Sequence, residues 1–303
     1  MNTAFMNWED TILYLRSTAY YRELLRDSYL DADLVGNAKR FEESGEFKET
    51  LRQIKIHHPT GNRLLDVGAG NGIASVAFAK NGFSVTALEP DPSETVGAKA
   101  IQKLADELSS LQMVVVQGVA EKMPFDKEVF DIVYVRQAMH HAADLNRFLM
   151  ECARVLKPGG ILFTVRDHVI YNHKDKERFL KEHPLHKYYG GENAFTDPQY
   201  RHAIEASGLQ ITDVLRHFDS IINYFPLSTE DLSGLKGKFN KQLNNRLQHK
   251  IGFFAGFRPF RYIYQKAISV RFGGPLDEKR IPGRLYSYIA RKPLISSNHS
   301  SKP

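Results

Sequence analysis

Residues 64–72 read LLDVGAGNG, a short apolar run followed by Asp66 and by three glycines at alternate positions, Gly68, Gly70 and Gly72. The next residues, IASVAFAKNG, have the composition of a buried helix that ends at an Asn-Gly pair. A strand, a glycine-rich turn and a helix in this order are typical of a nucleotide site at a helix N-terminus. The stretch therefore predicts an α/β fold that binds a nucleotide.

The spacing of the glycines argues against a dinucleotide. The dinucleotide fingerprint is Gly-x-Gly-x-x-Gly, and its third glycine would fall at Ile73. A carboxylate at Asp66 is unfavourable beside a pyrophosphate, but it suits a ligand that carries an ammonium group. A dehydrogenase is the nearest enzymatic alternative, and both features disfavour it.

Strand and helix patterns alternate along the middle of the chain. Apolar, β-branched runs predict strands at 63–67, 84–89, 111–117, 130–135, 161–166 and 209–218, and a last strand at 285–291. Helical periodicity separates them, and a capping-box pattern predicts a helix that begins at Thr196 and ends at Gly208. Strands separated by helices predict a parallel sheet that is covered on both faces.

Four sections follow from these patterns. We expect an N-terminal helical lid over residues 1–60, a Rossmann-like core over 61–218, a basic helical insertion over 219–283, and the last core strand with a tail over 284–303. The centre of the insertion, IGFFAGFRPFRYIYQKAISVRF, interleaves aromatic residues with cations. Such a helix packs on the protein's own core, or it faces an anionic membrane surface or an acidic acceptor.

Charge is distributed unevenly over the 303 residues. From Pro226 to Pro303 there are 15 Lys and Arg against 4 Asp and Glu, although the whole chain carries a net charge of only +6. The single cysteine, Cys152, excludes an intrachain disulfide and a cysteine-built zinc site. The N-terminus lacks an apolar signal core and no stretch resembles a membrane span, so we expect a cytoplasmic protein, peripheral at a membrane if the basic section binds one.

Five segments in order carry a resemblance to a known family. LLDVGAGNG resembles the first motif of class I S-adenosylmethionine-dependent methyltransferases, of the small-molecule, methyltransferase type 11-like kind. ALEPD, GVAEKMPF, FDIVYVRQAMHH and ARVLKPGGILFTV resemble the family's later motifs, over residues 63–216 together with the last strand. The resemblance implies an α/β fold with a Rossmann-like seven-stranded sheet, S-adenosyl-L-methionine as cofactor and methyl transfer by in-line displacement.

The resemblance also implies the cofactor contacts. Asp66 would hold the methionine ammonium, and Gly68, Gly70 and Gly72 would let the backbone approach the cofactor. Glu89 would accept hydrogen bonds from both ribose hydroxyls, and Pro90 would pack on the adenine. The remaining cofactor contacts are assigned to Val119, Ala120 and Arg136; many relatives have Asp at the position of Val119, so the contact with the adenine amino group falls to backbone groups.

Titratable residues follow the fourth and fifth strands, where the reacting groups of such folds gather. His140, His141 and His168 are the candidate catalytic bases, with Asp167 beside His168 and Arg166 as its charge partner; proximity without a base is the alternative. In HPLHKYYGGENAF, Tyr188, Tyr189, Glu192 and Asn193 are candidate acceptor contacts. No acidic cluster adjoins His183 and His186 in the sequence, so we expect no metal site.

The sequence favours methyl transfer to a small-molecule, sugar or lipid-linked acceptor, with oxygen as the favoured target atom. A nucleic-acid methyltransferase that uses the basic section is the first alternative. The residues after the fourth strand, RQAMHH, differ from the Asn/Asp-Pro-Pro-aromatic motif of base-modifying members and count against it. A non-catalytic protein that kept the cofactor pocket is the second.

Overall fold

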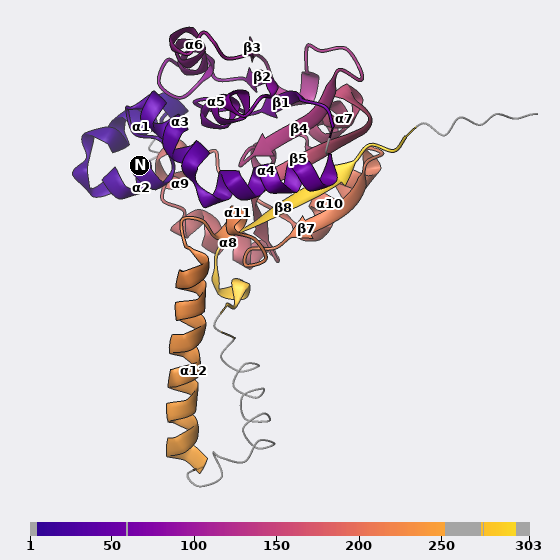
Figure 1. The fold of residues 1–303 in the computed structure, drawn as a ribbon. Helices are drawn as coiled ribbons and strands as arrows, with labels where there is room; N and C mark the ends of the chain where they lie inside the picture. The colour runs from indigo at the N-terminus through magenta and orange to yellow at the C-terminus, as the bar shows by residue number, and fades with distance from the viewer. Residues whose placement is uncertain (1–4, 59, 252–273, 275, 295–303) are drawn as a thin grey trace, which may run out of the picture.

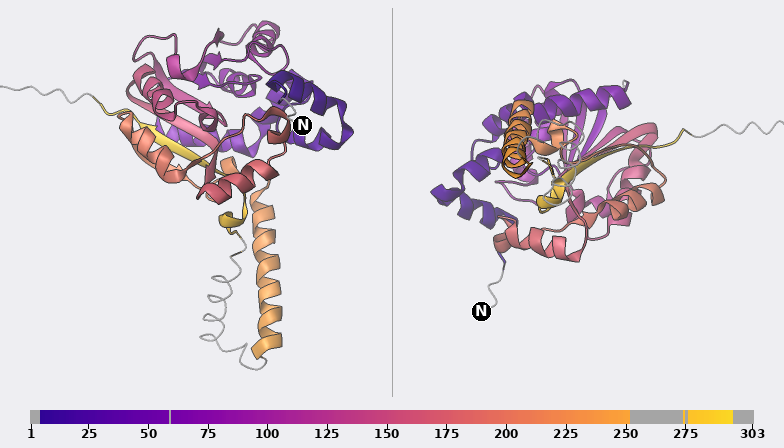
Figure 2. Two further views of the ribbon diagram at one scale, coloured as in Figure 1. Left: turned by 180° about the vertical axis from the view of Figure 1, so that it is seen from behind. Right: turned by 90° about the horizontal axis from the view of Figure 1, so that it is seen from below.

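The structure, a computed structural model, describes residues 5–58, 60–251, 274 and 276–294. A central sheet is covered by helices on both faces (Figure 1). The α/β, Rossmann-like fold expected from the sequence is confirmed. The long helix α12 extends away from this body (Figure 2).

The strands lie in the order β3-β2-β1-β4-β5-β8-β7, with the short β6 beside β5. Their bounds are β1 Arg63–Val67, β2 Ser84–Glu89, β3 Met113–Gln117, β4 Phe130–Arg136, β5 Leu156–Ile170, β6 Phe195–Thr196, β7 Gln210–Leu215 and β8 Arg284–Arg291. β1 pairs in parallel with both β2 and β4, so the strand order reverses between β1 and β4. β8 runs antiparallel to both of its neighbours, β5 and β7.

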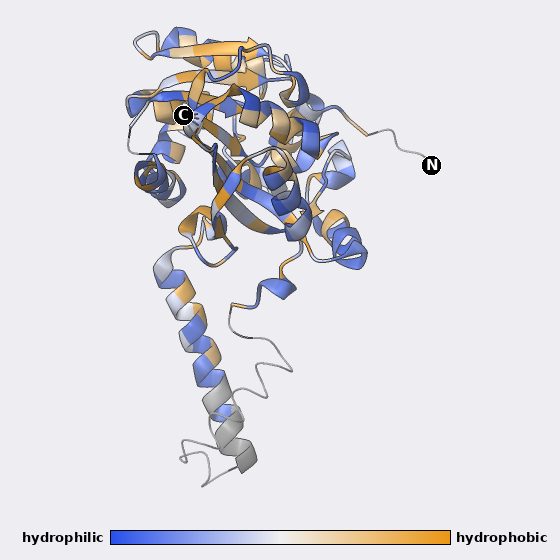
Figure 3. Ribbon diagram, turned by 90° about the vertical axis from the view of Figure 1, so that its right-hand side faces the viewer, coloured by the Kyte–Doolittle hydropathy of each residue, from blue (hydrophilic) through white to orange (hydrophobic). Residues whose placement is uncertain are grey.

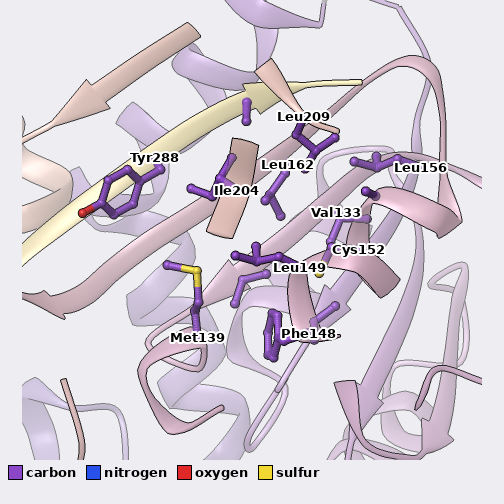
Figure 4. Close-up of a cluster of buried hydrophobic side chains, with 14 of the residues drawn as sticks. Val133, Met139, Phe148, Leu149, Cys152, Leu156, Leu162, Ile204, Leu209 and Tyr288 are labelled. Carbon is purple, nitrogen blue, oxygen red and sulfur yellow. The ribbon is translucent and has the colours of Figure 1, made fainter. Parts of the chain in front are cut away.

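Two groups of helices cover the sheet. One face carries α7 (Leu145–Val155) and α10 (Asp197–Ala206), whose apolar residues pack on β1, β4, β5 and β8. Figure 4 shows part of this cluster, in which Phe148, Leu149 and Cys152 of α7 lie against Val133 and Leu162. Burying each large apolar side chain contributes about 1.5–3 kcal/mol, so this cluster is a main source of stability.

The other face carries the N-terminal helices and α5. The helices concerned are α3 (Leu34–Glu43), α4 (Gly45–His57), α5 (Ile73–Lys80), α6 (Ala98–Glu107) and α11 (Ile221–Tyr224). Residues Ile73 to Ala79 of α5 are all buried, as expected of a helix that is apolar on every side. Three further helices, α1 (Trp8–Ser17), α2 (Arg22–Asp27) and α9 (His186–Tyr189), pack together beside the sheet, and α8 (His173–Glu182) follows β5.

Two elements differ from the patterns in the sequence. The helical pattern of residues 93–110 predicts a helix from Ser93, but α6 begins at Ala98, because Asp91 accepts a hydrogen bond from the backbone of Ser93 and residues 94–96 form a turn. β5 begins at Leu156 and runs to Ile170, so the segment KPGG at 157–160, which precedes the predicted strand 161–166, lies inside the observed strand. Gly159, with φ of +80°, and a register shift opposite Phe130 accommodate it there.

The insertion between β7 and β8 begins with α11 and continues as α12, Thr229–Ile251. Figure 3 shows polar residues predominating along the coloured part of α12, with apolar residues between them. The aromatic and basic centre predicted for the insertion falls on residues 251–272, almost all of which lie outside the described residues. Among the described helices, none is long and apolar enough to cross a membrane.

Candidate functional site

A cavity of about 450 Å³ lies at the carboxyl ends of β1, β2 and β4, where the strand order reverses. Open α/β sheets bind their ligands at this place. Of the residues predicted as cofactor-binding or catalytic, all but Gly72 line the cavity: Asp66, Gly68, Gly70, Glu89, Pro90, Val119, Ala120, Arg136, His140, His141 and His168. The structure therefore brings together residues that are up to 102 positions apart.

The glycine loop after β1 forms one wall. Gly68, Gly70 and Gly72 have φ of +67°, +57° and +83°, in the left-handed region that side chains avoid. A Cβ at Gly68 would lie 2.6 Å from the Cβ of Ala138, whereas a Cβ at Gly70 would meet nothing within 4 Å. Gly70 thus leaves free space for a ligand, and Gly72 caps α5 without lining the cavity.

Glu89 ends β2 with its carboxylate held in a fixed orientation. Its Oε2 accepts a hydrogen bond from the Gly70 amide at 2.7 Å, and its Oε1 accepts one from the Asp91 amide at 2.9 Å. Burial raises the pKa of Glu89 to about 7, because the two hydrogen bonds only partly offset the loss of water. Each oxygen keeps a further lone pair that a donor in the cavity can use.

Asp66 lies deeper, at the end of β1, and is almost fully buried. Its Oδ2 accepts a hydrogen bond of 2.6 Å from the Ser75 hydroxyl of α5. Burial raises the pKa of Asp66 to about 6, and the hydrogen bonds from Ser75 oppose that shift. A cationic group in the cavity would favour the ionised carboxylate.

Arg136 lines the cavity, but its guanidinium forms a bidentate ion pair with Glu46 of α4, at 2.6 and 3.1 Å. It also lies over the rings of Phe41 and Tyr29. The geometry gives Arg136 a role in holding α4 against β4, and its contact with the cofactor stays a prediction.

Arg166, predicted as a charge partner of Asp167 and His168, lies elsewhere. It donates to the carbonyls of Ile222 and Phe225 and approaches Glu46 to 3.5 Å. Its left-handed backbone, with φ of +62°, turns its side chain to the opposite face of the sheet.

The N-terminal helices cover the cavity. Trp8, Leu24, Ser28 and Leu30 line it from α1, α2 and the turn that follows α2. Asn71 of the glycine loop donates a hydrogen bond to the Tyr29 carbonyl at 2.7 Å. Two further hydrogen bonds hold these helices in place. The Thr95 amide donates to Glu9 at 3.1 Å, and the hydroxyls of Tyr21 and Tyr188 lie 2.6 Å apart.

At the other end of the cavity is a group that we call the histidine cluster: His140, His141, His168 and His183 with Asp167 and Glu192. His140 Nδ1 lies 3.1 Å from Asp167 Oδ1, and its Nε2 lies 3.7 Å from Glu192 Oε2. His168 Nδ1 donates to the Gly283 carbonyl at 2.6 Å, and His141 Nδ1 donates to the Gly191 carbonyl at 3.0 Å. Since a carbonyl oxygen only accepts, His141 and His168 each keep a proton-free Nε2 when neutral.

Protonation divides the histidine cluster. Burial would lower the pKa of His140, but hydrogen bonds with Asp167 and Glu192 outweigh burial and raise the pKa to about 9. The pKa of His168 is well below its usual value, through burial and the adjacent His140, and the same causes lower the pKa of His141. Cationic and neutral imidazoles therefore lie side by side at neutral pH.

Several members of the site follow from no local pattern. Among the predicted acceptor contacts, Tyr189 and Glu192 line the cavity, whereas Tyr188 packs with Tyr21 under the N-terminal cover. Glu192 and His140 are 52 residues apart, so their approach depends on the tertiary fold and not on a local pattern. The run of polar and aromatic residues at 183–195 was the one sequence signal for this segment.

Residues 65–164 match the model of a methyltransferase domain. A ubiquinone biosynthesis O-methyltransferase of Rhizobium johnstonii is 29% identical over 160 residues, which are 50% of this chain and 62% of that protein. An uncharacterized methyltransferase of Bacillus subtilis is 34% identical over 46% of this chain and 52% of its own length. The chain thus spans less than two thirds of each of these two curated relatives.

Solved structures with the same fold include a methyltransferase of Bacillus halodurans described as putative, with a TM-score of 0.50 and 25% identity over 81% of this chain and 99% of that chain. A geranyl diphosphate methyltransferase in complex with S-adenosylmethionine has a TM-score of 0.53 and 17% identity, over 86% and 89% of the two chains. The [4+2]-cyclase SpnF shares the fold too, with a TM-score of 0.52 and 21% identity over 82% of each chain. Residues 65–164 are thus a methyltransferase domain, and the sheet that contains them has the fold of solved methyltransferases.

Proposed function

We propose that the protein transfers the methyl group of S-adenosylmethionine to an oxygen atom of a small-molecule acceptor. One observation carries the proposal: a single cavity joins the glycine loop and two buried carboxylates at one end to the histidine cluster at the other. The first end suits the cofactor and the second suits a polar acceptor. The Rhizobium relative is an O-methyltransferase, which supports oxygen as the target.

The residues at the first end fit the cofactor. Glu89, with both carboxylate oxygens oriented by backbone amides, would accept from the ribose hydroxyls. Asp66 would pair with the methionine ammonium, and Gly70 leaves free the space that a Cβ would fill. Pro90, Val119 and Ala120 line the part of the cavity that would receive the adenine.

The bound cofactor supplies a methyl group that its sulfonium already activates. The chain then has to align the acceptor and keep water out. Trp8, Leu24 and Leu30 close the cavity on the solvent side and serve the second task. An acceptor hydroxyl would lose its proton to Nε2 of His141, while its oxygen forms the new bond to carbon.

His141 suits this role better than the two other candidates. Its Nδ1 is fixed by the Gly191 carbonyl, and its ring lies on the cavity wall, so its Nε2 is available to an acceptor. His140 is held between Asp167 and Glu192, and His168 packs edge-on against His140, with the two ring centroids 4.8 Å apart.

An anionic or lipid-linked acceptor, met at a membrane surface, is the favoured class. After Asp231, α12 contains no acidic residue, and its side chains Lys236, Lys238 and Lys241 are exposed. A helix with this charge attracts anionic headgroups. The residues after β4, RQAMHH, argue against a nucleic-acid base as acceptor, because they differ from the motif of base-modifying methyltransferases.

The test is mass spectrometry of an extract of the source cells incubated with the protein and deuteromethyl-labelled S-adenosylmethionine. We expect a labelled small molecule whose fragments place the methyl on oxygen, and no labelled RNA or DNA. Label on nitrogen, carbon or a nucleic acid would contradict the proposal. If the protein binds the cofactor but labels no molecule in the extract, a protein that does not transfer methyl groups is favoured. The fold permits this, because a cyclase shares it.

A further inference from the structure

Three side chains of the histidine cluster converge in a way that the proposed methyl transfer does not require. One ligand atom each from His140, His168 and Glu192 lies within 4.8 Å of the other two. His140 Nε2 and Glu192 Oε2 are 3.7 Å apart, and all three residues line the cavity. Two imidazoles and a carboxylate are a common ligand set for divalent transition metals.

Both histidines are oriented as metal ligands usually are. A metal-bound histidine donates its second ring N–H to a carboxylate or a backbone carbonyl, which fixes the ring and the tautomer. His140 Nδ1 has Asp167 as this partner and His168 Nδ1 has the Gly283 carbonyl, at 3.1 and 2.6 Å. The Nε2 atom of each ring is left for the shared space beside Glu192.

A second observation comes from His183. Its Nδ1 is buried without a hydrogen-bond partner, 3.8 Å from Glu192 Oε1, and its ring lies 5.4 Å from that of His168. An unpaired buried nitrogen is costly unless something binds it. The side chain adjoins the same three residues and offers a fourth nitrogen to the group.

The charges agree. Asp167 and Glu192 are both almost fully buried, and among the described residues neither has a lysine or arginine partner. Asp167 Oδ2 has no hydrogen-bond partner either. A divalent cation between the imidazoles would balance two carboxylates in a site that offers no other cation than histidine.

We propose that the histidine cluster binds one divalent transition-metal ion, such as Zn²⁺, through His140, His168 and Glu192, with His183 beside it and the remaining positions open to the cavity. Zinc ligands lie about 2.0–2.2 Å from the metal, so tetrahedral ligand atoms are about 3.4 Å apart. The distance of 3.7 Å between His140 Nε2 and Glu192 Oε2 is already near that value. The longer distances within the group, up to 4.8 Å, need side-chain shifts of about 1 Å. A role for the ion in binding the acceptor oxygen rests on the proposed function, whereas metal binding itself does not.

The experiment uses the full, untagged chain, stripped with a chelator. Calorimetric titration with Zn²⁺ and visible absorption with Co²⁺ report the ion directly, without an activity assay. We expect one ion per chain and a Co²⁺ spectrum of nitrogen and oxygen ligands. His168→Ala and Glu192→Gln should each weaken Zn²⁺ binding at least 10-fold, and Asp167→Asn about 10–100-fold. His173→Ala, which changes an exposed histidine of α8, should leave it unchanged.

S-adenosylhomocysteine binding to each variant is the control for folding, because the cofactor end of the cavity is separate. If His168→Ala fails this control, His168→Asn replaces it. Absence of a tight site, or equal Zn²⁺ affinity in wild type, His168→Ala and Glu192→Gln, would overturn the metal site and leave the cofactor assignment intact. Tight metal binding without methyl transfer would instead count against the proposed function alone.

Discussion

Glu89 and Asp66 are buried carboxylates that form no ion pair within the described part of the chain, and their protonation should govern cofactor affinity. The pKa of Glu89 is raised to about 7 and that of Asp66 to about 6 in the ligand-free protein. Only the ionised Glu89 accepts with both oxygens, so affinity is full above pH 7 and falls as the pH drops through that value. Below it we expect about tenfold weaker binding per pH unit.

The measurement is calorimetry with S-adenosylhomocysteine between pH 5.5 and 8.5, in which the ligand's own groups change little. Glu89→Gln is the matched control, because it should bind more weakly and lose the step near pH 7. A wild-type affinity that is constant over this range would show that Glu89 is not protonated or does not contact the ligand.

His141 should matter for turnover and little for the cofactor. If its Nε2 takes the acceptor proton, His141→Ala should lower kcat by about 10²–10⁴-fold, with cofactor affinity nearly unchanged. His202→Ala, an exposed histidine on α10, is the control and should keep normal turnover. Near-normal kcat in His141→Ala would mean that proximity alone suffices.

For single residues, the sequence predicted which side chains line the cavity better than it predicted which side chains they pair with. Asp66 and Glu89 were predicted from the resemblance to methyltransferase motifs, and both lie near the carboxyl ends of neighbouring strands, which share one edge of a parallel sheet. The pairing of His140 with Asp167 and Glu192 joins residues from three segments, and the pairing of Arg136 with Glu46 joins β4 to an N-terminal helix. Contacts of this kind depend on tertiary packing, which local patterns do not contain.

Among the elements, α1 and α2 contribute residues that cover the cavity. Their buried residues Ile12, Leu15 and Leu25 pack with Val96 in a small cluster of their own, separate from the main core. A small separate cluster opens at lower free energy than the sheet. The predicted lid over residues 1–60 therefore remains a prediction about motion, with its contacts now specified.

The only tryptophan of the chain, Trp8, lines the cavity and packs edge-on against Tyr189. Cofactor binding should change its fluorescence, because the ligand replaces water near the ring and fixes α1. Hydrogen exchange should show residues 20–47 becoming protected in the same titration. Trp8→Phe removes the optical signal and serves as the blank. Unchanged fluorescence and equal exchange with and without ligand would indicate a permanently packed helix.

Element boundaries show where periodicity stops being informative. Most strands were predicted within one or two residues, since their β-branched runs are bounded by polar turns. The start of α6 was missed because turn hydrogen bonds of Asp91 compete with a helical pattern. The continuation of β5 past Arg166 was missed because it pairs there with β8, a strand more than 110 residues away, and its start at Leu156 depends on pairing with Phe130 of β4.

For the whole molecule, charge separates the folded body from α12. We expect the protein to bind vesicles of anionic lipid and not neutral ones, and binding should weaken as salt rises. Changing Lys236, Lys238 and Lys241 to Glu should abolish flotation with anionic vesicles. The same charge change at Lys55, Lys103 and Lys127, exposed on the body, should have a smaller effect.

If the change of Lys236, Lys238 and Lys241 to Glu does not alter flotation, α12 does not contribute to vesicle binding. If the wild type binds neither vesicle type, the proposed membrane interaction is wrong. Tight, salt-sensitive binding to duplex or single-stranded nucleic acid would favour a nucleic-acid acceptor.

The central claim is that the cavity holds S-adenosylmethionine, and calorimetry with the wild type, Asp66→Ala and Glu89→Ala tests it most directly. The account predicts that S-adenosylhomocysteine binds and NAD does not, and that each substitution weakens binding by about 1–3 kcal/mol, the contribution of a charge-assisted hydrogen bond. Tight NAD binding, or S-adenosylhomocysteine affinity unchanged in both variants, would contradict it.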